Sequence, residues 1–145
     1  MHAAASRALF QEDVQNFSTE LARRRGWQFY SIDYPLIDCL FASAGRTALR
    51  LRLTCDNWND LPPAISLLGV DGSVLATLPP NPTGVFNSGP HPSTGKPFVC
   101  MRGAREYHTH PSHVTDLWSN IRESDSYTLG GILTQLWNAW LKGSE

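Results

Sequence analysis

The sequence is short of cysteine, of net charge and of long apolar runs. Its three cysteines are odd in number and far apart, which argues against a disulfide framework and favours a reducing, cytoplasmic setting. The N-terminal segment lacks the sustained apolar stretch of a secretory signal, and no run approaches the roughly 20 residues of a membrane span. The formal net charge of -1 gives no electrostatic basis for binding nucleic acid or an anionic membrane, so we expect neither as a partner.

Internal repeats and glycine-rich phosphate loops are also absent from the sequence, and we predict no cofactor. Hydrophobic residues make up 41% of the 145 positions, and five residues are tryptophans. A chain of this size and composition can bury one core. Residues 1–145 are therefore expected to form a single domain.

An amphipathic helix is predicted close to the N-terminus. Apolar residues recur at spacings of three and four from Phe10 to Leu21, which places them on one helical face, whereas Asp13 is expected to face solvent. Three arginines at positions 23–25 suit the negative end of the helix dipole. Gly26 can adopt the left-handed conformation that ends a helix.

Four β-strands are predicted after this helix. The clearest contains Leu49, Leu51 and Leu53, which alternate with arginines and mark a half-buried antiparallel strand. The four runs, each bounded by turn residues, are residues 27–32, 36–44, 48–54 and 64–70. We predict a four-stranded antiparallel meander whose apolar face is covered by the N-terminal helix, with Cys39 and Cys55 as inert packing residues.

A long loop and helices complete the predicted α+β fold. Residues 79–97 contain six prolines and three glycines, which excludes regular structure, and the prolines should hold this loop stiff and off Cys100. A short helix is predicted at residues 116–121. The final helix is amphipathic, although Gly130 and Gly131 weaken its first turn. Its apolar stripe comprises Leu129, Ile132, Leu133, Leu136 and Trp140.

The stretch from His91 to His113 concentrates the chemistry of the chain, because it holds Cys100 and four of the five histidines. Two kinds of site are compatible with these residues. One is a reactive thiol at Cys100, and the other is a metal ion bound by the histidines. We predict the first and no bound metal.

The order of elements around Cys100 resembles the ubiquitin-conjugating enzyme fold, in which a helix, a four-stranded meander and a loop with His-Pro precede a cysteine and further helices. His91-Pro92-Ser93 precedes Cys100 by nine residues, much as a His-Pro-Asn triplet precedes the catalytic cysteine of that family. The segment PFVCMRGAREYHTHPSHVTDLW is similar to divergent prokaryotic relatives of these enzymes. Those relatives occur beside ubiquitin-like proteins and activating enzymes in bacterial conjugation and antiphage systems.

The resemblance implies a transferase that carries a ubiquitin-like protein. Cys100 would accept the modifier from a ubiquitin-activating-type enzyme as a thioester and pass it to a nucleophile on a protein target. The cationic residues Lys96, Arg102 and Arg105 would lower the pKa of the thiol if they point toward it. By position in the family, the first helix with its arginines would face the activating enzyme.

Two departures from the family pattern affect the expected site. Ser93 replaces the asparagine that is thought to support the oxyanion during transfer, and Asn87 lies in the same loop as a substitute. Residues 105–108, Arg-Glu-Tyr-His, stand where the family has a tryptophan and proline signature. The surface that faces the acceptor is therefore expected to differ.

The histidines support a rival hypothesis. His108 and His110, in an extended segment, would point the same way, as two metal ligands require. His-Thr-His-Pro resembles the motif of zinc (JAMM-like) isopeptidases that cleave ubiquitin-like conjugates. Trp118 and Ile121, however, stand where that motif has serine and aspartate.

A third hypothesis is a non-catalytic binding module that keeps the conjugating-enzyme fold without using the thiol. In the carrier, the histidines would shape the loop over the cysteine, or one would act as a general base. The sequence does not choose among the histidines. The candidate catalytic residues are Cys100, Ser93, His108 and His110.

Overall fold

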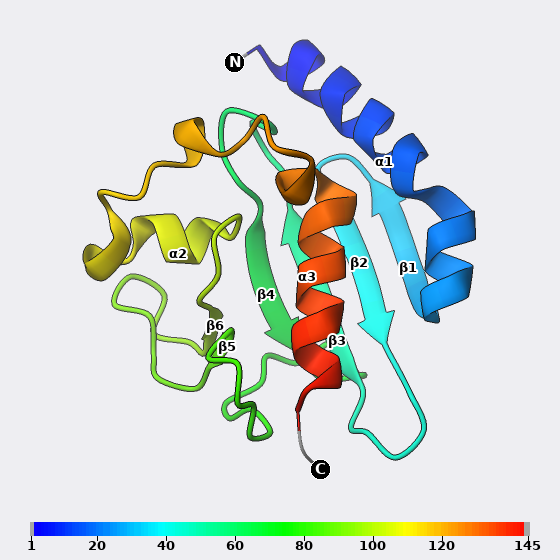
Figure 1. Cartoon of the computed structure of the whole chain (residues 1–145), viewed down its shortest axis with the longest axis vertical. Helices are drawn as coiled ribbons and strands as arrows, with labels where there is room; N and C mark the ends of the chain where they lie inside the picture. Colours follow the sequence, from blue (N-terminus) through cyan, green and yellow to red (C-terminus); the bar gives the residue numbers. More distant parts are fainter. Residues whose placement is uncertain (1, 144–145) are drawn as a thin grey trace.

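The structure, a computed structural model, describes residues 2–143, apart from the side chains of residues 18–21, so the predicted role of Leu21 lies outside the described residues (Figure 1). The predicted α+β order is confirmed: a helix, four strands, a long loop and C-terminal helices. Its helices and strands are α1 (Ala3–Arg25), β1 (Trp27–Asp33), β2 (Leu36–Phe41), β3 (Leu49–Thr54), β4 (Ala64–Leu68), β5 (Phe86–Asn87), β6 (Phe98–Val99), α2 (Arg105–Thr109) and α3 (Leu129–Leu141). Short 3₁₀ turns are η1 (Pro111–His113), η2 (Trp118–Asn120) and η3 (Asp125–Tyr127).

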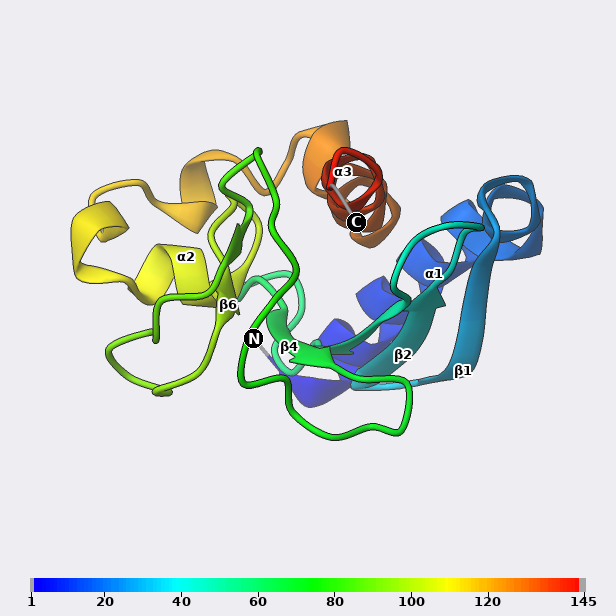
Figure 2. The same ribbon diagram turned by 90° about the horizontal axis from the view of Figure 1, so that it is seen from below.

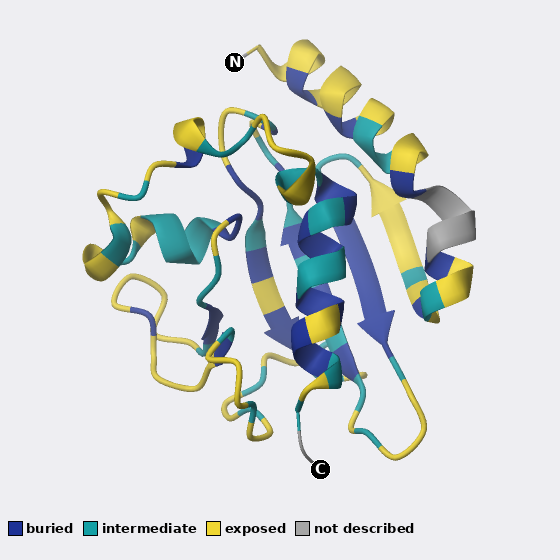
Figure 3. Ribbon diagram, viewed as in Figure 1, coloured by how far each residue is buried: buried dark blue, intermediate teal, exposed yellow. Residues whose placement is uncertain are grey.

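The main sheet is the predicted antiparallel meander, with strand order β1-β2-β3-β4. The alternation in β3 sets its orientation, because Leu49, Leu51 and Leu53 are all buried on the core face. Arg50 and Arg52 lie on the other face, where both contact the Asp38 carboxylate. Figure 3 shows the resulting gradient: β2 is buried along most of its length, whereas β1 at the edge is largely exposed.

The apolar face of this sheet is covered by α3, while α1 packs beside it against β1 (Figures 1 and 2). Phe41 of β2 meets two tryptophans of α3, with ring centroids 5.2 Å from Trp137 and 5.9 Å from Trp140. The whole predicted stripe of α3 is buried. The covering role that the sequence assigns to the N-terminal helix is therefore shared, and α3 has the larger part of it.

The start of α3 contacts α1 closely. Asp13 of α1 accepts a hydrogen bond from the Leu129 backbone N–H (3.1 Å), and burial raises the pKa of its carboxyl. The prediction that Asp13 faces solvent was wrong, because its carboxylate accepts from one of the backbone N–H groups that have no partner within α3 at the start of that helix. At the other end of α1, Gly26 adopts the predicted left-handed conformation, with φ 80°.

Cys39 and Cys55 are fully buried in the core, as predicted for packing residues. Burial raises the pKa of the Cys39 thiol to about 12, and it raises the pKa of Cys55 as well. Both thiols are therefore protonated at neutral pH. This leaves Cys100, which is only partly buried, as the accessible cysteine.

The segment between β4 and α3 forms a smaller lobe beside the sheet (Figure 2). The predicted loop is irregular except for β5, which pairs with β6. The short helix predicted at residues 116–121 is the 3₁₀ turn η2, and α2 was not predicted. Within residues 2–143, no helix combines the length and apolarity needed to cross a membrane.

Candidate functional site

Cys100 lies directly after β6, partly exposed, at the junction between the hairpin and α2. Its backbone N–H donates to the Val85 carbonyl oxygen (2.7 Å), next to β5. The proline-rich loop therefore contacts the backbone of the cysteine, while Cys100 itself stays partly exposed. The loop contributes a strand that fixes the backbone on which the thiol is carried.

His113 is the side chain that the fold brings to the thiol. Its Nε2 lies 3.8 Å from the Cys100 Sγ. The imidazole is stacked on the Tyr107 ring, with centroids 4.1 Å apart and an angle of 14° between the planes. A stacked ring has little freedom to turn, so the nitrogen is held facing the sulfur. A neutral imidazole at this distance can take a proton from the thiol.

Sequence reasoning left His113 as one of several histidines that could bind a metal or act as a general base, and did not select it. Thirteen positions separate it from Cys100, and this spacing matches no regular element. Contact requires the chain to turn back through α2 and η1, a path that local patterns do not encode. The only available signal was that His113 belongs to the same histidine cluster.

His108 was expected in an extended segment, but it lies in α2 and both of its ring nitrogens are occupied. Nε2 accepts from the Gly103 N–H (3.1 Å) and Nδ1 lies 2.8 Å from the Asp116 carbonyl oxygen. This network assigns the proton to Nδ1, which donates to that carbonyl. Burial lowers the pKa of His108 and keeps the ring neutral. His108 therefore ties the chain before α2 to the chain after η1.

His110 and His91 also have structural contacts. The His110 Nδ1 accepts from the Ser112 N–H (3.1 Å), and its ring stacks on Phe98 at 5.7 Å. His91 is buried, with Nδ1 accepting from the Ser93 N–H (3.0 Å) and Nε2 donating to the Glu106 carbonyl oxygen (2.8 Å). The His-Pro segment is thereby fastened to α2.

Ser93 occupies an exposed turn that closes on itself through the Gly95 N–H, which donates to the His91 carbonyl oxygen (2.8 Å). Among the described residues, no hydrogen bond joins Ser93 to Cys100. Asn87, the proposed substitute, uses its side-chain oxygen to accept from the Gly89 N–H (2.8 Å). The structure thus brings His113 to the thiol, and it fastens the turn of Ser93 to His91 instead.

Two of the three predicted cations are paired with carboxylates. Arg102 Nε lies 2.7 Å from an Asp116 oxygen, and an Arg105 nitrogen lies 2.9 Å from an Asp56 oxygen. Burial raises the pKa of the Cys100 thiol above its ordinary value. The expectation that these cations lower the thiol pKa is not met, because opposite charges hold two of them. Deprotonation must depend on a neighbouring base.

We expect Arg102→Gln and Lys96→Gln to leave the reactivity of Cys100 nearly unchanged. Because no cation stabilises the thiolate, the pH at which alkylation reaches half its maximal rate should shift by less than about 0.3 units, a small fraction of a typical thiol perturbation. Iodoacetamide labelling of Cys100, followed by mass spectrometry across pH 6–10, measures this. If either substitution raises this midpoint pH by half a unit or more, the cation that it removes does stabilise the thiolate.

The short helix α2 is positioned by two residues that were predicted to face the acceptor. The half-buried Glu106 carboxylate accepts from the Ile65 N–H of β4 (3.0 Å), and desolvation raises the pKa of this carboxyl. The Arg105 N–H donates to the Pro63 carbonyl oxygen (2.8 Å), and its Nε donates to Pro62 (3.1 Å). The site is therefore anchored on the edge strand of the sheet.

A metal centre gains no support from this arrangement. Within the part of the chain that the structure describes, no group of three or more His, Cys, Asp or Glu side chains is arranged to hold a metal ion. His108 has no free lone pair, because both nitrogens take part in hydrogen bonds. The Asp116 carboxylate accepts from Tyr107 (2.6 Å) and Arg102.

The described residues thus define an α+β protein with a partly exposed thiol beside a histidine. Residues 87–143 match the sequence model of the Y4jH family, described as Y4jH-like. This matched segment runs from β5 through α3 and contains Cys100, His113 and α2. No curated protein matches the chain.

Proposed function

We propose that this chain is a cysteine-dependent carrier of a ubiquitin-like protein. The observation that carries the proposal is the pair formed by Cys100, partly exposed after β6, and the His113 Nε2 at 3.8 Å. The order of helix, meander, loop and cysteine supports the resemblance to ubiquitin-conjugating enzymes. The setting implied by that resemblance is bacterial antiphage defence in the cytoplasm.

The carrier reaction has two acyl-transfer steps. In the first, the Cys100 thiolate attacks the activated C-terminal carbonyl of the modifier, a C–S bond forms, and the bond to the group on the activating enzyme breaks. In the second, an amine or other nucleophile on the target attacks the thioester carbonyl. The new bond to the target forms, the C–S bond breaks, and the electron pair returns to the Cys100 sulfur.

His113 supplies the proton transfer that both steps need. Because burial keeps Cys100 protonated, the His113 Nε2 first takes the proton from Sγ. The imidazolium then gives this proton to the leaving group on the activating enzyme or to solvent, so that after the thioester has formed the same nitrogen can take the proton lost by the attacking nucleophile. Tyr107 acts as a positioning residue, because its ring holds the imidazole in place.

The remaining candidate residues have distinct proposed roles. Ser93, exposed in a turn fastened by His91, is the residue to which the family resemblance would give the support of the oxyanion. His108 and His110 act as positioning residues, since the first ties together the chain around α2 and the second caps η1.

The test is charging with an activating enzyme, a ubiquitin-like protein and ATP. Wild-type protein should form an adduct on non-reducing electrophoresis that thiol reagents remove. Cys100→Ala should form none, and Cys100→Ser should form an oxyester that resists thiol reagents but not alkali. A Cys39→Ala variant, altered at a buried thiol, should charge like wild type.

Failure of the wild type to charge, while the activating enzyme itself is charged, would refute the carrier for that modifier. A binding module of the same fold is the second candidate, because the raised pKa of the Cys100 thiol and the pairing of Arg102 and Arg105 with carboxylates fit a protein that does not use the thiol. A module would bind the modifier equally well as wild type and as Cys100→Ala. An isopeptidase would instead lose cleavage activity on chelation and in His110→Ala.

A further inference from the structure

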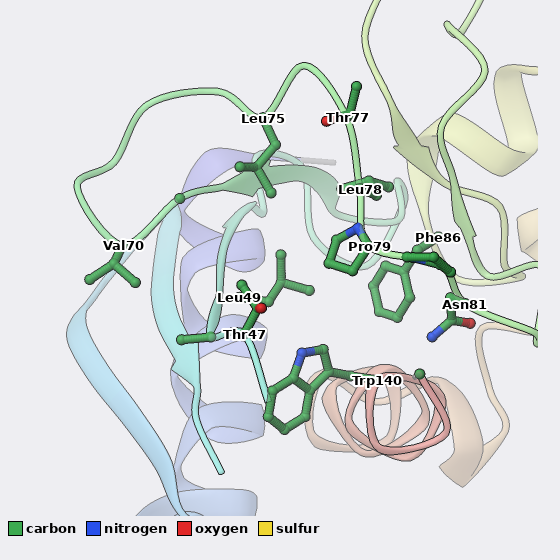
Figure 4. A pocket seen from close by; sticks show the side chains of 14 residues that line it. Thr47, Leu49, Val70, Leu75, Thr77, Leu78, Pro79, Asn81, Phe86 and Trp140 are labelled. Atoms are coloured by element: carbon green, nitrogen blue, oxygen red, sulfur yellow. The ribbon is translucent and has the colours of Figure 1, made fainter. Parts of the chain in front are cut away.

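A second feature of the molecule is an apolar cavity of about 480 Å³ at the C-terminal end of α3 (Figure 4). It lies between β3, the segment after β4 and the proline-rich loop. The side chains that form its walls include Leu49, Leu75, Leu78, Pro79, Phe86 and Trp140. Cavities of roughly 300–1,000 Å³ are typical of small-molecule sites.

The described residues that form the cavity wall carry no formal charge, and their polar side chains are those of Thr47, Thr77, Asn81 and Trp140. The Asn81 amide is already used, since it donates to the Ala139 carbonyl oxygen (2.9 Å). Trp140 is 6% exposed, and no described side chain or backbone group accepts a hydrogen bond from its indole N–H; the nitrogen is not fully buried, so it is open to the cavity. Figure 4 shows the N–H edge of this ring turned toward Leu49 and Thr47.

An indole N–H in a nearly buried ring usually finds an acceptor. A charged ligand would lose its hydration here without gaining an opposite charge. A purely apolar ligand would fill the volume but leave the Trp140 donor unpaired. We infer that this cavity binds a small, uncharged and largely apolar molecule that presents one hydrogen-bond acceptor, such as a carbonyl oxygen, to Trp140.

This site is separate from the thiol but connected to it by the short hairpin. Phe86 forms part of the cavity wall and pairs across strands with Val99, the residue before Cys100. The Cys100 N–H is bonded to Val85, the residue before Phe86. Binding in the cavity should therefore be visible at the Cys100 amide as well as at the Trp140 indole. The inference does not depend on the carrier reaction.

A matched pair of probes tests it. 2-Acetylnaphthalene has a carbonyl acceptor, and 2-ethylnaphthalene has nearly the same shape without one. We expect saturable binding of both to the full chain, with the acetyl compound bound about three- to tenfold more tightly, as one net hydrogen bond implies. In ¹H–¹⁵N spectra, the Trp140 indole signal should move with the acetyl probe, and the Cys100 amide should move with both.

Two variants make the result specific. Trp140→Phe keeps an aromatic ring, removes the donor, and should bring the two affinities to within about twofold. Leu75→Phe fills part of the cavity and should weaken both probes together. Circular dichroism confirms that each variant is folded. The inference is overturned if neither probe binds wild type saturably, if both bind it equally, or if the shifted signals lie away from the cavity.

Discussion

Replacing His113 by glutamine is expected to slow iodoacetamide labelling of Cys100 by at least about tenfold at neutral pH, since a positioned base typically contributes about a hundredfold or more. Burial raises the pKa of the thiol, so the reactive thiolate forms only when a base takes the proton. The His113 Nε2, 3.8 Å from Sγ, is the base in contact. Mass spectrometry of the labelled Cys100 peptide over time gives the rate.

His110→Asn is the matched control. His110 belongs to the same cluster and its ring centroid lies 5.8 Å from that of His113, but its contacts are to Ser112 and Phe98. The labelling rate of this variant should stay within about twofold of wild type, since the asparagine oxygen can still cap η1 and position 110 touches no reacting atom. In His113→Gln, hydroxide replaces the imidazole as the base. The labelling rate should then increase about tenfold for each unit by which the pH is raised, until the pH reaches the pKa of the thiol. Equal rates in the two variants would remove His113 from the mechanism.

Gly130→Ala is expected to lower the free energy of unfolding by about 1–2 kcal/mol, although alanine in an ordinary helix would raise it by about 1 kcal/mol. A Cβ at position 130 would lie 2.6 Å from the Phe17 Cβ of α1. Phe17 is buried and its ring packs against Phe29 of β1, so the helix cannot move aside without disturbing the core. Urea denaturation monitored by tryptophan fluorescence measures the change.

Asn138→Ala, at an exposed position of the same helix, provides the comparison. There the higher helix propensity of alanine has no close contact to oppose it, so stability should rise by a few tenths of a kcal/mol to about 0.7 kcal/mol. The opposite signs of the two substitutions distinguish helix propensity from helix contact. If Gly130→Ala instead raises the stability, α1 must be able to shift enough to accommodate the added Cβ.

The periodic helices and strands could be predicted from the sequence because the spacing of the apolar residues in each one shows which of its faces is buried. The Leu49, Leu51 and Leu53 alternation fixes which face of β3 is buried, and the α3 stripe from Leu129 to Trp140 fixes the face of that helix. What the sequence did not show is which helix lies over the sheet. That depends on packing between segments far apart in the chain, including the close approach of α1 to Gly130.

The position of Cys100 as a candidate could also be predicted, but its surroundings could not. Arg102 and Arg105 are close to it in sequence and were expected to act on the thiol, yet each is held by a carboxylate, Asp116 or Asp56. His108 and His110 form the visible motif, and their nitrogens bond to backbone groups. The sequence shows which side chains lie near Cys100 along the chain. Which groups those side chains contact depends on the tertiary fold.

The anchoring of α2 on β4 also governs how the molecule meets other chains. β4 ends the sheet, and unpaired N–H and C=O groups on such a strand invite a foreign strand to add. Here the Glu106 carboxylate accepts a hydrogen bond from the Ile65 N–H, and the Arg105 N–H donates to the Pro63 carbonyl oxygen. The Leu75 N–H donates to the Leu67 carbonyl oxygen (3.2 Å). The same contacts that hold the thiol site therefore block edge-to-edge aggregation on this side and leave β1 as the open border of the sheet.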